Sequence, residues 1–386
     1  MTKNREPVLV AFGRTALARA NKGSFAETHP VEYGAQALRG ILDKVPKLDR
    51  AEIDDVIVGC AQPERYLGWN AARLISQRAG LPDSVPAHIV NRFCSSGLQS
   101  VATAANAISA GEMDVVVAGG IEMMTNINME LAAEYQYKAL IEQAPASYMA
   151  MGLTGELVAE RYAITRHEME VFAVESHKRA ASAKDAGKFT DEIIPVEVKT
   201  QGGVIKLAGD EGVRAGTNLQ ALAELKPCFK EDGLLTAATS SQMTDGASFV
   251  VLMSREKAQS LGIAPIARFV SFSVAGLAPE VMGLGPIYAV PKVLKKTGLT
   301  LESMDVIELN EAFASQAIAC IRDLNLPPEK TNPNGGAIAL GHPMGATGSV
   351  LICKALSQLI RTGGRYAMIT MCIGGGMGAA GIIEIE

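Results

Sequence analysis

The hydrophobic positions of the chain form short β-branched runs that alternate with stretches of helical periodicity. Short apolar runs bounded by Gly, Pro and Asp are typical of buried strands, whereas apolar residues three and four positions apart indicate amphipathic helices. We expect strands at 8–12, 54–59, 88–93, 114–120, 249–253, 267–274, 306–309, 367–372 and 380–386. We expect helices at 31–45, 69–79, 96–110, 167–186, 286–297, 311–322 and 346–362. Strands separated by helices predict an α/β protein with buried, largely parallel sheets.

The two ends of the chain share a faint internal repeat. Segments 51–59 and 301–309 align at an offset of 250 residues, and both place an Asp just before a Val-Ile strand. Cys94 and His342 lie 248 residues apart, and each precedes small residues that open an amphipathic helix. The pattern favours two copies of one α/β unit, although unrelated α/β segments can match equally well by chance.

Residues 121–245 differ in character from the segments on either side. Met, Glu, Tyr and Lys become frequent there, and helical patterns mix with polar stretches such as 199–217, which we interpret as a loop. We expect an insertion that lies over the sheets. The predicted organisation is therefore an N-terminal half at 1–120 plus 246–266, a loop domain at 121–245 and a C-terminal half at 267–386.

Composition and charge narrow the range of partners. The 386 residues are 48% hydrophobic with a formal net charge of −5, so the chain can bury a core but lacks the basic surface that nucleic acid or anionic membrane attracts. Six scattered cysteines without a CxxC pair indicate reduced thiols rather than a disulfide framework. Because the N-terminal segment is also too charged for a signal peptide, we expect a cytoplasmic protein.

One uncharged stretch is long enough to cross a bilayer. Residues 331–353 carry no formal charge over 23 positions, but five glycines and two prolines interrupt them. Such a sequence is typical of a Gly-rich loop that enters a buried helix, so we expect no membrane span.

Cys94 lies where a predicted strand gives way to a helix, in NRFCSSGLQS. A thiol at a helix N-terminus experiences the helix dipole and free N–H groups, and both favour the thiolate. The alternative is a buried and inert cysteine, which is the commonest state of a free cysteine.

His342 is one of only five histidines and lies in the glycine-dense segment NGGAIALGHPMGATG. Backbone can approach a ligand closely at such glycines, and a histidine beside a cysteine can take its proton. The alternative is a structural histidine with satisfied hydrogen bonds. The sequence contains no HxxxH or HxH spacing, so we expect no metal site.

Two further residues follow predicted strands. Cys372 enters the segment IGGGMG, whose backbone N–H groups could point at an anion as an oxyanion hole requires. Asn310 follows the strand 306–309, where its carboxamide could hold a water or orient a neighbour. It also fits the N-cap of the helix expected at 311–322.

Together these segments resemble the thiolase family. The motifs are NRFCSSGLQS (91–100), LNEAFA (309–314), NGGAIALGHPMGATG (334–348) and MCIGGGMG (371–378), supported by TAATSSQMTDGA (236–247) and VMGLGP (281–286). The likeness runs from about residue 8 to the C-terminus, and the motifs in this order and spacing are very specific. It implies an α/β protein with the duplicated thiolase fold, five-layered α/β/α/β/α, with an inserted loop domain.

The resemblance also implies roles for individual residues. Cys94 would be the acyl-accepting nucleophile, His342 its activator, and Cys372 the acid and base for the acetyl-CoA enolate and the incoming thiol. Asn310, through a held water, would form one oxyanion site with His342, and the N–H groups of Cys94 and Gly374 would form the other. Positions implied to contact coenzyme A or line the reactive end are Met151, Arg214, Ala237, Ser241, Ala312 and Phe313. Coenzyme A would be a co-substrate, with no metal or other cofactor.

The motif variants point to a degradative 3-ketoacyl-CoA thiolase, an acetyl-CoA C-acyltransferase of fatty acid β-oxidation. The serines of CSSG and TSS favour this branch, as does Ala150 where biosynthetic members usually carry His. NEAF rather than HDCF argues against the sterol-carrier branch, and Cys–His–Cys rather than Cys–His–His against a carrier-protein synthase. An acetyl-CoA acetyltransferase that makes acetoacetyl-CoA is the alternative, and a non-catalytic acyl-CoA-binding scaffold is a remote one.

The sequence departs from the family pattern in the region that shapes the acyl pocket. Gly155 and Leu157 replace the usual Ala and Asn, and residues 121–148 match poorly, so the acyl chain length is left open. The resemblance implies acyl-CoA and CoA as small-molecule partners and a homodimer or dimer of dimers. A hydratase/dehydrogenase partner in a β-oxidation multienzyme complex is also possible for degradative members.

Overall fold

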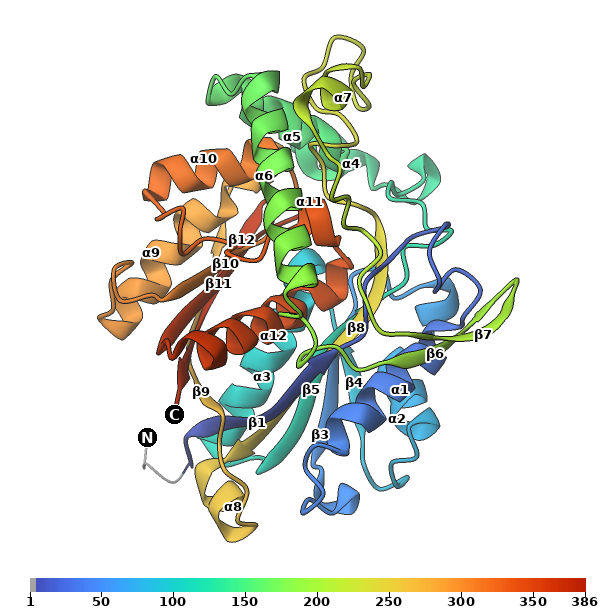
Figure 1. Ribbon diagram of the computed structural model, residues 1–386, viewed down its shortest axis with the longest axis vertical. Helices are drawn as coiled ribbons and strands as arrows, with labels where there is room; N and C mark the ends of the chain where they lie inside the picture. The colour runs from blue at the N-terminus through green and yellow to red at the C-terminus, as the bar shows by residue number, and fades with distance from the viewer. Residues whose placement is uncertain (1–4) are drawn as a thin grey trace.

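The computed structural model describes residues 5–386 and contains the alternating helices and strands shown in Figure 1. The strands are β1 (Pro7–Arg14), β2 (Ala18–Arg19), β3 (Asp55–Gly59), β4 (Ala87–Val90), β5 (Val115–Glu122), β6 (Val196–Thr200), β7 (Gly203–Leu207), β8 (Thr244–Ser254), β9 (Ala267–Gly276), β10 (Val306–Leu309), β11 (Tyr366–Ile373) and β12 (Met377–Ile385). The helices are α1 (Pro30–Leu42), α2 (Ala71–Arg78), α3 (Ser96–Ala110), α4 (Lys138–Gln143), α5 (Met151–Arg161), α6 (Arg166–Asp185), α7 (Leu219–Ala223), α8 (Arg255–Ser260), α9 (Gly285–Thr297), α10 (Ala314–Leu324), α11 (Ala337–Leu340) and α12 (Met344–Thr362).

All nine predicted strands and all seven predicted helices are confirmed, with differences at their ends. β8 begins at Thr244, five residues before the predicted strand, because the buried Asp245 accepts hydrogen bonds from the backbone and hydroxyl of Thr125 and so stays within the sheet. β4 ends at Val90, and a 3-10 turn over Phe93–Ser95 replaces the strand end that we expected at residue 93.

The strand order repeats in the two halves of the chain. The first half has the order β4-β3-β5-β8-β1, and the second has β10-β11-β12-β9 with Thr331 bridged to Ile307 outside β10. In both halves the pairs toward the free edge are parallel, and the two pairs toward the β1–β9 junction are antiparallel. The expectation of largely parallel sheets was therefore wrong, because β8, β1, β9 and β12 all pair antiparallel with their neighbours. β1 and β9 join the two sheets through a short antiparallel contact. The duplication predicted from the sequence is therefore present in the pairing itself.

The offset between the copies is 251 residues rather than the predicted 250. Asp54 accepts the backbone N–H groups of Asp114 and Val115, and Asp305 accepts those of Arg365 and Tyr366. The two aspartates therefore do the same work in the two copies, whereas the sequence alignment paired Asp55 with Asp305. A shift of one residue would turn every strand side chain to the opposite face of the sheet. The strand pairing therefore determines the offset, whereas the sequence alignment did not.

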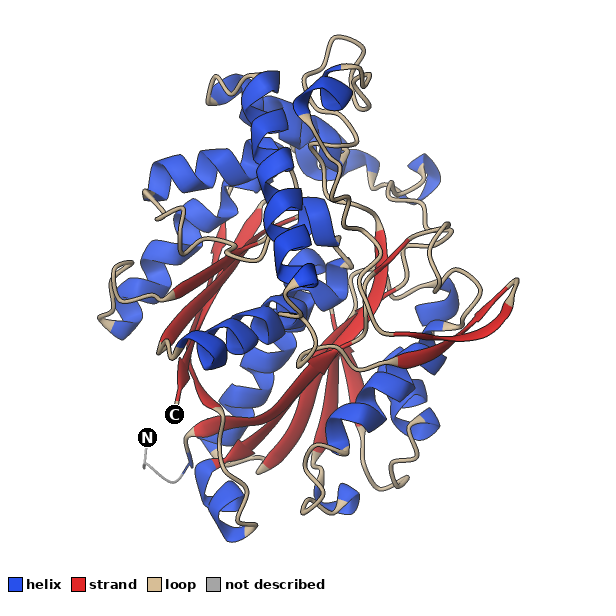
Figure 2. Ribbon diagram, in the orientation of Figure 1, coloured by secondary structure: helices blue, strands red, loops and turns tan. Residues whose placement is uncertain are grey.

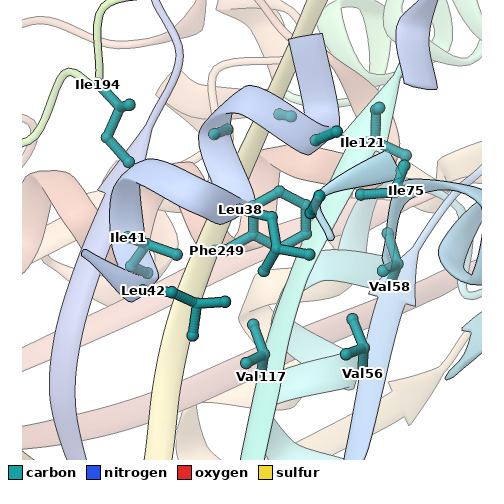
Figure 3. Close-up of a cluster of buried hydrophobic side chains, with 14 of the residues drawn as sticks. Leu38, Ile41, Leu42, Val56, Val58, Ile75, Val117, Ile121, Ile194 and Phe249 are labelled. Carbon is teal, nitrogen blue, oxygen red and sulfur yellow. The ribbon is translucent and has the colours of Figure 1, made fainter. Parts of the chain in front are cut away.

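The elements form five layers, α/β/α/β/α, as expected for the thiolase fold. α1 and α2 cover the outer face of the first sheet, α9 and α10 cover the outer face of the second, and α3 and α12 pack between the sheets (Figure 2). Figure 3 shows the outer core of the first half, where Leu38 and Ile41 of α1 face Val58, Val117 and Phe249 of the sheet. Because both faces of the first sheet are covered at its centre, β3 and β5 are buried throughout their length, as their apolar composition predicts.

The segment between β5 and β8 carries α4 to α7 and a two-stranded hairpin of β6 and β7. We expected residues 199–217 to be a polar loop, and this was wrong for the part that forms β7. Val196 and Val198 alternate with exposed residues and join the core beneath α1, whereas Val204 and Ile205 of β7 are exposed. Four of the five residues of β7 are exposed, so this strand forms through its pairing with β6 and not by entering the core.

A buried ion cluster ties this segment to the first half. Arg14, at the end of β1, is fully buried, and its guanidinium donates to Glu192 at 2.8 Å and to Asp210 at 2.7 and 2.9 Å. Removing one partner from such a pair leaves an uncompensated charge and costs about 3–5 kcal/mol. The cluster therefore fixes Glu192 and Asp210 of the insertion to the end of β1.

The uncharged stretch 331–353 is divided between a loop, the short helix α11 and the start of α12. None of the helices within residues 5–386 combines the length and hydrophobicity that a bilayer crossing requires.

Candidate active site

A pocket of about 520 Å³ lies between the two halves and the inserted segment. Three of the residues that line it are the reactive side chains singled out from the sequence, Cys94, His342 and Cys372. They come from three segments that are far apart in the chain, namely the turn before α3, the turn before α12 and the end of β11. The fold thus brings two thiols and one imidazole to one cavity.

Cys94 lies in the 3-10 turn of Phe93–Ser95, directly before α3 begins at Ser96. Phe93 adopts a positive φ of 43°, which costs a residue with a side chain about 1–2 kcal/mol. The Ser96 hydroxyl stabilises the turn, since it accepts from the Arg92 N–H at 2.8 Å and donates to the Phe93 carbonyl at 2.7 Å. This strained turn presents the partly exposed Cys94 to the pocket.

The electrostatic environment of Cys94 favours the thiol rather than the thiolate that we expected. Burial raises its pKa to about 11, and the nearby Glu122 charge adds to the rise. Hydrogen bonds from the backbone N–H groups of Gly374 and of Cys94 itself act in the opposite direction but do not outweigh burial. The dipole argument was therefore insufficient, because desolvation of a charge exceeds the effect of a helix end. A base is needed to ionise this thiol.

His342 is buried and occupies the turn before α12. Its Nδ1 lies 2.7 Å from the Thr347 hydroxyl, one turn into the helix, and its backbone N–H donates to the Thr244 hydroxyl at 3.1 Å. Burial lowers its pKa to about 4, so the ring is neutral at pH 7. When Nδ1–H donates to Thr347, Nε2 keeps its lone pair, which is what a base for a neighbouring thiol requires.

Asn310 lies behind His342 rather than on the wall of the pocket. Its Nδ2 is 3.5 Å from His342 Nε2, and its buried Oδ1 has no hydrogen-bond partner within residues 5–386. A buried carboxamide oxygen without a partner is a position where an ordered water or a ligand group can bind.

The predicted N-cap role of Asn310 was wrong. α10 begins only at Ala314, and Phe313 is its N-cap residue. The residues between are extended because Ser240 bridges to Phe313 and the Ser241 N–H donates to the Ala312 carbonyl at 2.9 Å. Pairing with this neighbouring segment prevents the chain from entering the helix at Glu311.

Cys372 is fully buried near the end of β11, and burial together with the nearby Cys94 raises its pKa well above the usual value. Gly374 follows two residues later and is also buried, but it does not line the pocket. It approaches the site through its N–H, which donates to the sulfur of Cys94. The glycine-rich turn after β11 therefore aims backbone donors at the nucleophilic sulfur.

α3 and α12 bring Cys94 and His342 together by crossing near their N-termini. A Cβ atom on Gly97 would lie 2.9 Å from the carbonyl oxygen of Gly345 and from the backbone nitrogen of Ser349. A Cβ atom on Gly348 would collide with the backbone of Leu98. The two helices thus touch backbone to backbone, which only glycine permits.

All six positions expected to contact coenzyme A also line the pocket. They are Met151, Arg214, Ala237, Ser241, Ala312 and Phe313. Ala312 and Phe313 are buried, whereas Arg214 and Ala237 are exposed at the opening.

The sequence analysis missed two cations at the pocket, Arg19 and Lys22. Neither they nor Arg214 forms an ion pair within the part of the chain that the structure describes. Burial and the positive charge of Arg19 lower the pKa of Arg214, so these cations repel one another. No sequence motif surrounds Arg19 and Lys22, so the sequence could not identify them as pocket residues. The pairing of β2 with β8 brings them to the pocket.

Family models and similar proteins match nearly the whole length of this chain. The family models described as "Thiolase, N-terminal domain" and "Thiolase, C-terminal domain" match residues 7–256 and 263–385. The 3-ketoacyl-CoA thiolase of Bacillus subtilis (strain 168) is 48% identical over 390 residues, which cover 99% of this chain and 100% of the relative. The Bacillus anthracis acetyl-CoA acetyltransferase structure has a TM-score of 0.92 at 36% identity over 99% of both chains. The human mitochondrial 3-ketoacyl-CoA thiolase structure has a TM-score of 0.90 at 35% identity over 100% of both chains. This chain therefore belongs to the thiolase family.

Proposed function

We propose that the protein is an acetyl-CoA C-acyltransferase that cleaves 3-ketoacyl-CoA with coenzyme A, giving acetyl-CoA and a shortened acyl-CoA. The observation that carries the proposal is the convergence of Cys94, His342 and Cys372 on one pocket, with Asn310 behind the imidazole. The reaction needs a sulfur nucleophile, a base for it, and a second acid–base group at the leaving carbon. The pocket provides one residue for each task.

In the first half-reaction, His342 Nε2 takes the proton of the Cys94 thiol, and the thiolate attacks the C3 carbonyl carbon of the substrate. The C2–C3 bond then breaks, and its electron pair forms the enolate of acetyl-CoA while the acyl group stays on Cys94. The Cys372 thiol gives its proton to C2 and releases acetyl-CoA. The N–H groups of Cys94 and Gly374 hold the oxygen of the attacked carbonyl.

In the second half-reaction, the Cys372 thiolate takes the proton of the incoming CoA thiol. The CoA sulfur attacks the acyl carbon, the bond to Cys94 breaks, and His342 returns its proton to Cys94. Earlier, in the first half-reaction, Asn310 acts through a water at its unpartnered Oδ1 and, together with His342, holds the thioester oxygen of the acetyl unit while the enolate forms. The protons balance over the full cycle, because Cys94 and Cys372 each give one in the first half-reaction and receive one in the second.

The charges at the pocket opening support coenzyme A as the co-substrate. Arg19, Lys22 and Arg214 lie there without carboxylate partners in the described residues, although they repel one another. Unpaired cations held in this way are suited to the phosphate groups of coenzyme A, which carry several negative charges. The reactive thiols lie further inside, where the pantetheine end would reach.

The test is a thiolysis assay with a panel of 3-ketoacyl-CoA lengths, following the CoA-dependent loss of the substrate's enolate absorbance. Turnover of chains longer than acetoacetyl-CoA is expected. If only acetoacetyl-CoA is cleaved, and two acetyl-CoA molecules condense readily, the acetyl-CoA acetyltransferase alternative replaces the proposal. No turnover in either direction with tight acyl-CoA binding would identify a non-catalytic binding protein.

We further propose that the protein forms a homodimer through the edge of its first sheet. β4 is the last strand of that sheet, and all four of its residues are partly exposed. Trp69, 95% exposed, directly precedes Asn70, whose side chain donates to the Ala87 carbonyl of β4. An uncovered edge strand with an exposed aromatic ring is suited to pairing with a second copy. Sedimentation of the native protein and of Trp69→Arg should show a dimer that the substitution weakens.

Six free cysteines support a reducing compartment, in keeping with the proposed cytoplasmic location.

A further inference from the structure

Glu122 is a buried carboxylate that the proposed reaction does not use. It ends β5, is 0% exposed, and has no cationic partner among the described residues. One oxygen accepts the backbone N–H groups of Ala61 at 2.9 Å and Gly345 at 2.7 Å, and the other accepts that of Gln62 at 3.2 Å. Glu122 therefore binds two separate backbone segments through their amide hydrogens.

One of these segments leads directly to His342. The N-cap residue of α12 is Pro343, whose side chain has no acceptor for the free N–H groups of the first turn. Glu122 supplies that acceptor from another strand by binding the Gly345 N–H. A carboxylate at this position also complements the positive end of the helix. His342 precedes Pro343, so the capped turn is the one that holds the imidazole.

The other segment leads to Cys94. The Ala61 carbonyl accepts from the Asn91 side chain at 3.1 Å, and the Asn91 carboxamide oxygen accepts the Phe93 N–H at 2.8 Å. Phe93 has the strained positive φ that turns Cys94 toward the pocket. The chain of contacts from Glu122 through Ala61 and Asn91 thus ends one residue before the nucleophile.

We propose that Glu122 is a positioning residue that holds the Cys94 turn and the His342 turn in one frame, by capping α12 from β5 while anchoring the Ala61–Asn91 link. The inference rests on the proposed function for its catalytic consequence. It concerns a residue that lies outside the pocket and contacts neither substrate nor a reacting atom.

The hydrogen-bond donors around Glu122 favour its ionised form. Three backbone donors and the Cys60 thiol, 3.8 Å away, point at its two oxygens, and a carboxylate has acceptors only. Burial raises the pKa of Glu122 to about 7, against the effect of these hydrogen bonds. A glutamine of the same shape would turn its NH₂ group toward N–H donors and leave at least one of them unpaired.

The experiment compares Glu122→Gln, Asn91→Ala and the double variant with the full-length protein. The matched control is Glu170→Gln, which removes another buried carboxylate, paired with Arg166 and remote from the pocket lining. Single-turnover acylation by a 3-ketoacyl-CoA gives both the rate constant and the fraction of competent sites. Hydrogen exchange of segments 91–97 and 340–348 reports the two turns without any need for activity.

Glu122→Gln should slow acylation about 10- to 100-fold, as loss of a supporting contact typically does, while the fraction of competent sites is unchanged. Exchange should quicken in both segments, whereas Glu170→Gln should change neither reading. Asn91→Ala should quicken exchange in 91–97 alone and slow acylation less. The double variant should be no slower than Glu122→Gln, because both act through one link.

The proposal is overturned if Glu122→Gln acylates at the native rate or if its hydrogen exchange rises in one segment only. It is also overturned if the effects of Glu122→Gln and Asn91→Ala on the acylation rate multiply in the double variant. Should Glu122→Gln fail to fold, an unchanged acylation rate and unchanged exchange in Asn91→Ala would overturn the link to Cys94. A native protein that does not turn over would remove the proposed function. The exchange measurements would still decide whether Glu122 joins the two turns.

Discussion

The two halves share one strand order, yet they bring different groups to the pocket. In the second half, β10 and β11 lead to Asn310 and Cys372, both close to the reacting centre. The matching strands of the first half, β3 and β5, lead to Cys60 and Glu122, which lie outside the pocket lining. The first half supplies one reacting side chain, Cys94, and the second supplies the side chains that move protons or hold the acetyl thioester oxygen. The two halves therefore have the same strand arrangement, but the residues at the strand ends stabilise the structure in the first half and take part in the proposed reaction in the second.

The largest effect that would separate the halves is expected from Cys94→Ala. Since Cys94 is the nucleophile of the proposed reaction, turnover should fall by about 10⁴-fold or more, and no acyl-enzyme should form. Intact-protein mass spectrometry after mixing with acyl-CoA measures this directly. An acyl-enzyme that persists in the variant would transfer the nucleophilic role to another residue.

Cys372→Ala should leave acylation possible but prevent protonation of the enolate. We expect exchange of the α-protons of acetyl-CoA with deuterated solvent to slow by about 10³-fold, in the range of lost acid–base catalysis. Mass spectrometry should still detect the acyl-enzyme. Equal and small losses in both measurements would show that Cys372 does not carry out the proton transfer.

Asn310→Ala removes the carboxamide behind His342 and should lower kcat by about 100-fold, the usual consequence of losing one oxyanion contact. The KM for CoA should change little, because Asn310 does not line the pocket. Steady-state kinetics with saturating thioester measures both. A change confined to KM would assign Asn310 to binding.

The pH dependence of alkylation tests the first half alone. Since the pKa of Cys94 is about 11, its thiolate fraction should rise about tenfold for each pH unit between pH 7 and pH 10. His342, with a pKa of about 4, stays neutral throughout this range. The rate of iodoacetamide labelling of the Cys94 peptide should follow the same slope, and a plateau below pH 8 would mean that the thiolate is already formed.

The smallest effect is expected at the pocket opening. Lys22→Ala should raise the KM for CoA about threefold to tenfold by removing one exposed charge contact, with kcat unchanged. With dephospho-CoA the native protein and the variant should differ less if Lys22 contacts the 3′-phosphate. Identical effects with both thiols would place the contact at the diphosphate.

The sequence predicted the strands and helices of both halves because strands covered on both faces are continuous apolar runs, and their flanking glycines mark the ends. It also singled out Cys94, His342 and Cys372, because glycine-rich turns beside reactive side chains are unusual. It could not reveal that residues 310–313 stay extended, since that depends on pairing with Ser240 and Ser241 far away in the chain. Arg19, Lys22 and Glu122 were missed for the same reason, because their roles arise only from contacts across the fold.

The backbone contact between α3 and α12 has a consequence for substrate range. Helices that touch without intervening side chains cannot part slightly to admit a longer acyl tail, since there is no flexible layer to compress. Widening is instead expected in the segment between β5 and β8, where Met151 and Phe229 line the pocket. Selection for a different acyl chain length should therefore change residues of the segment between β5 and β8 and leave the crossing of α3 and α12 unchanged.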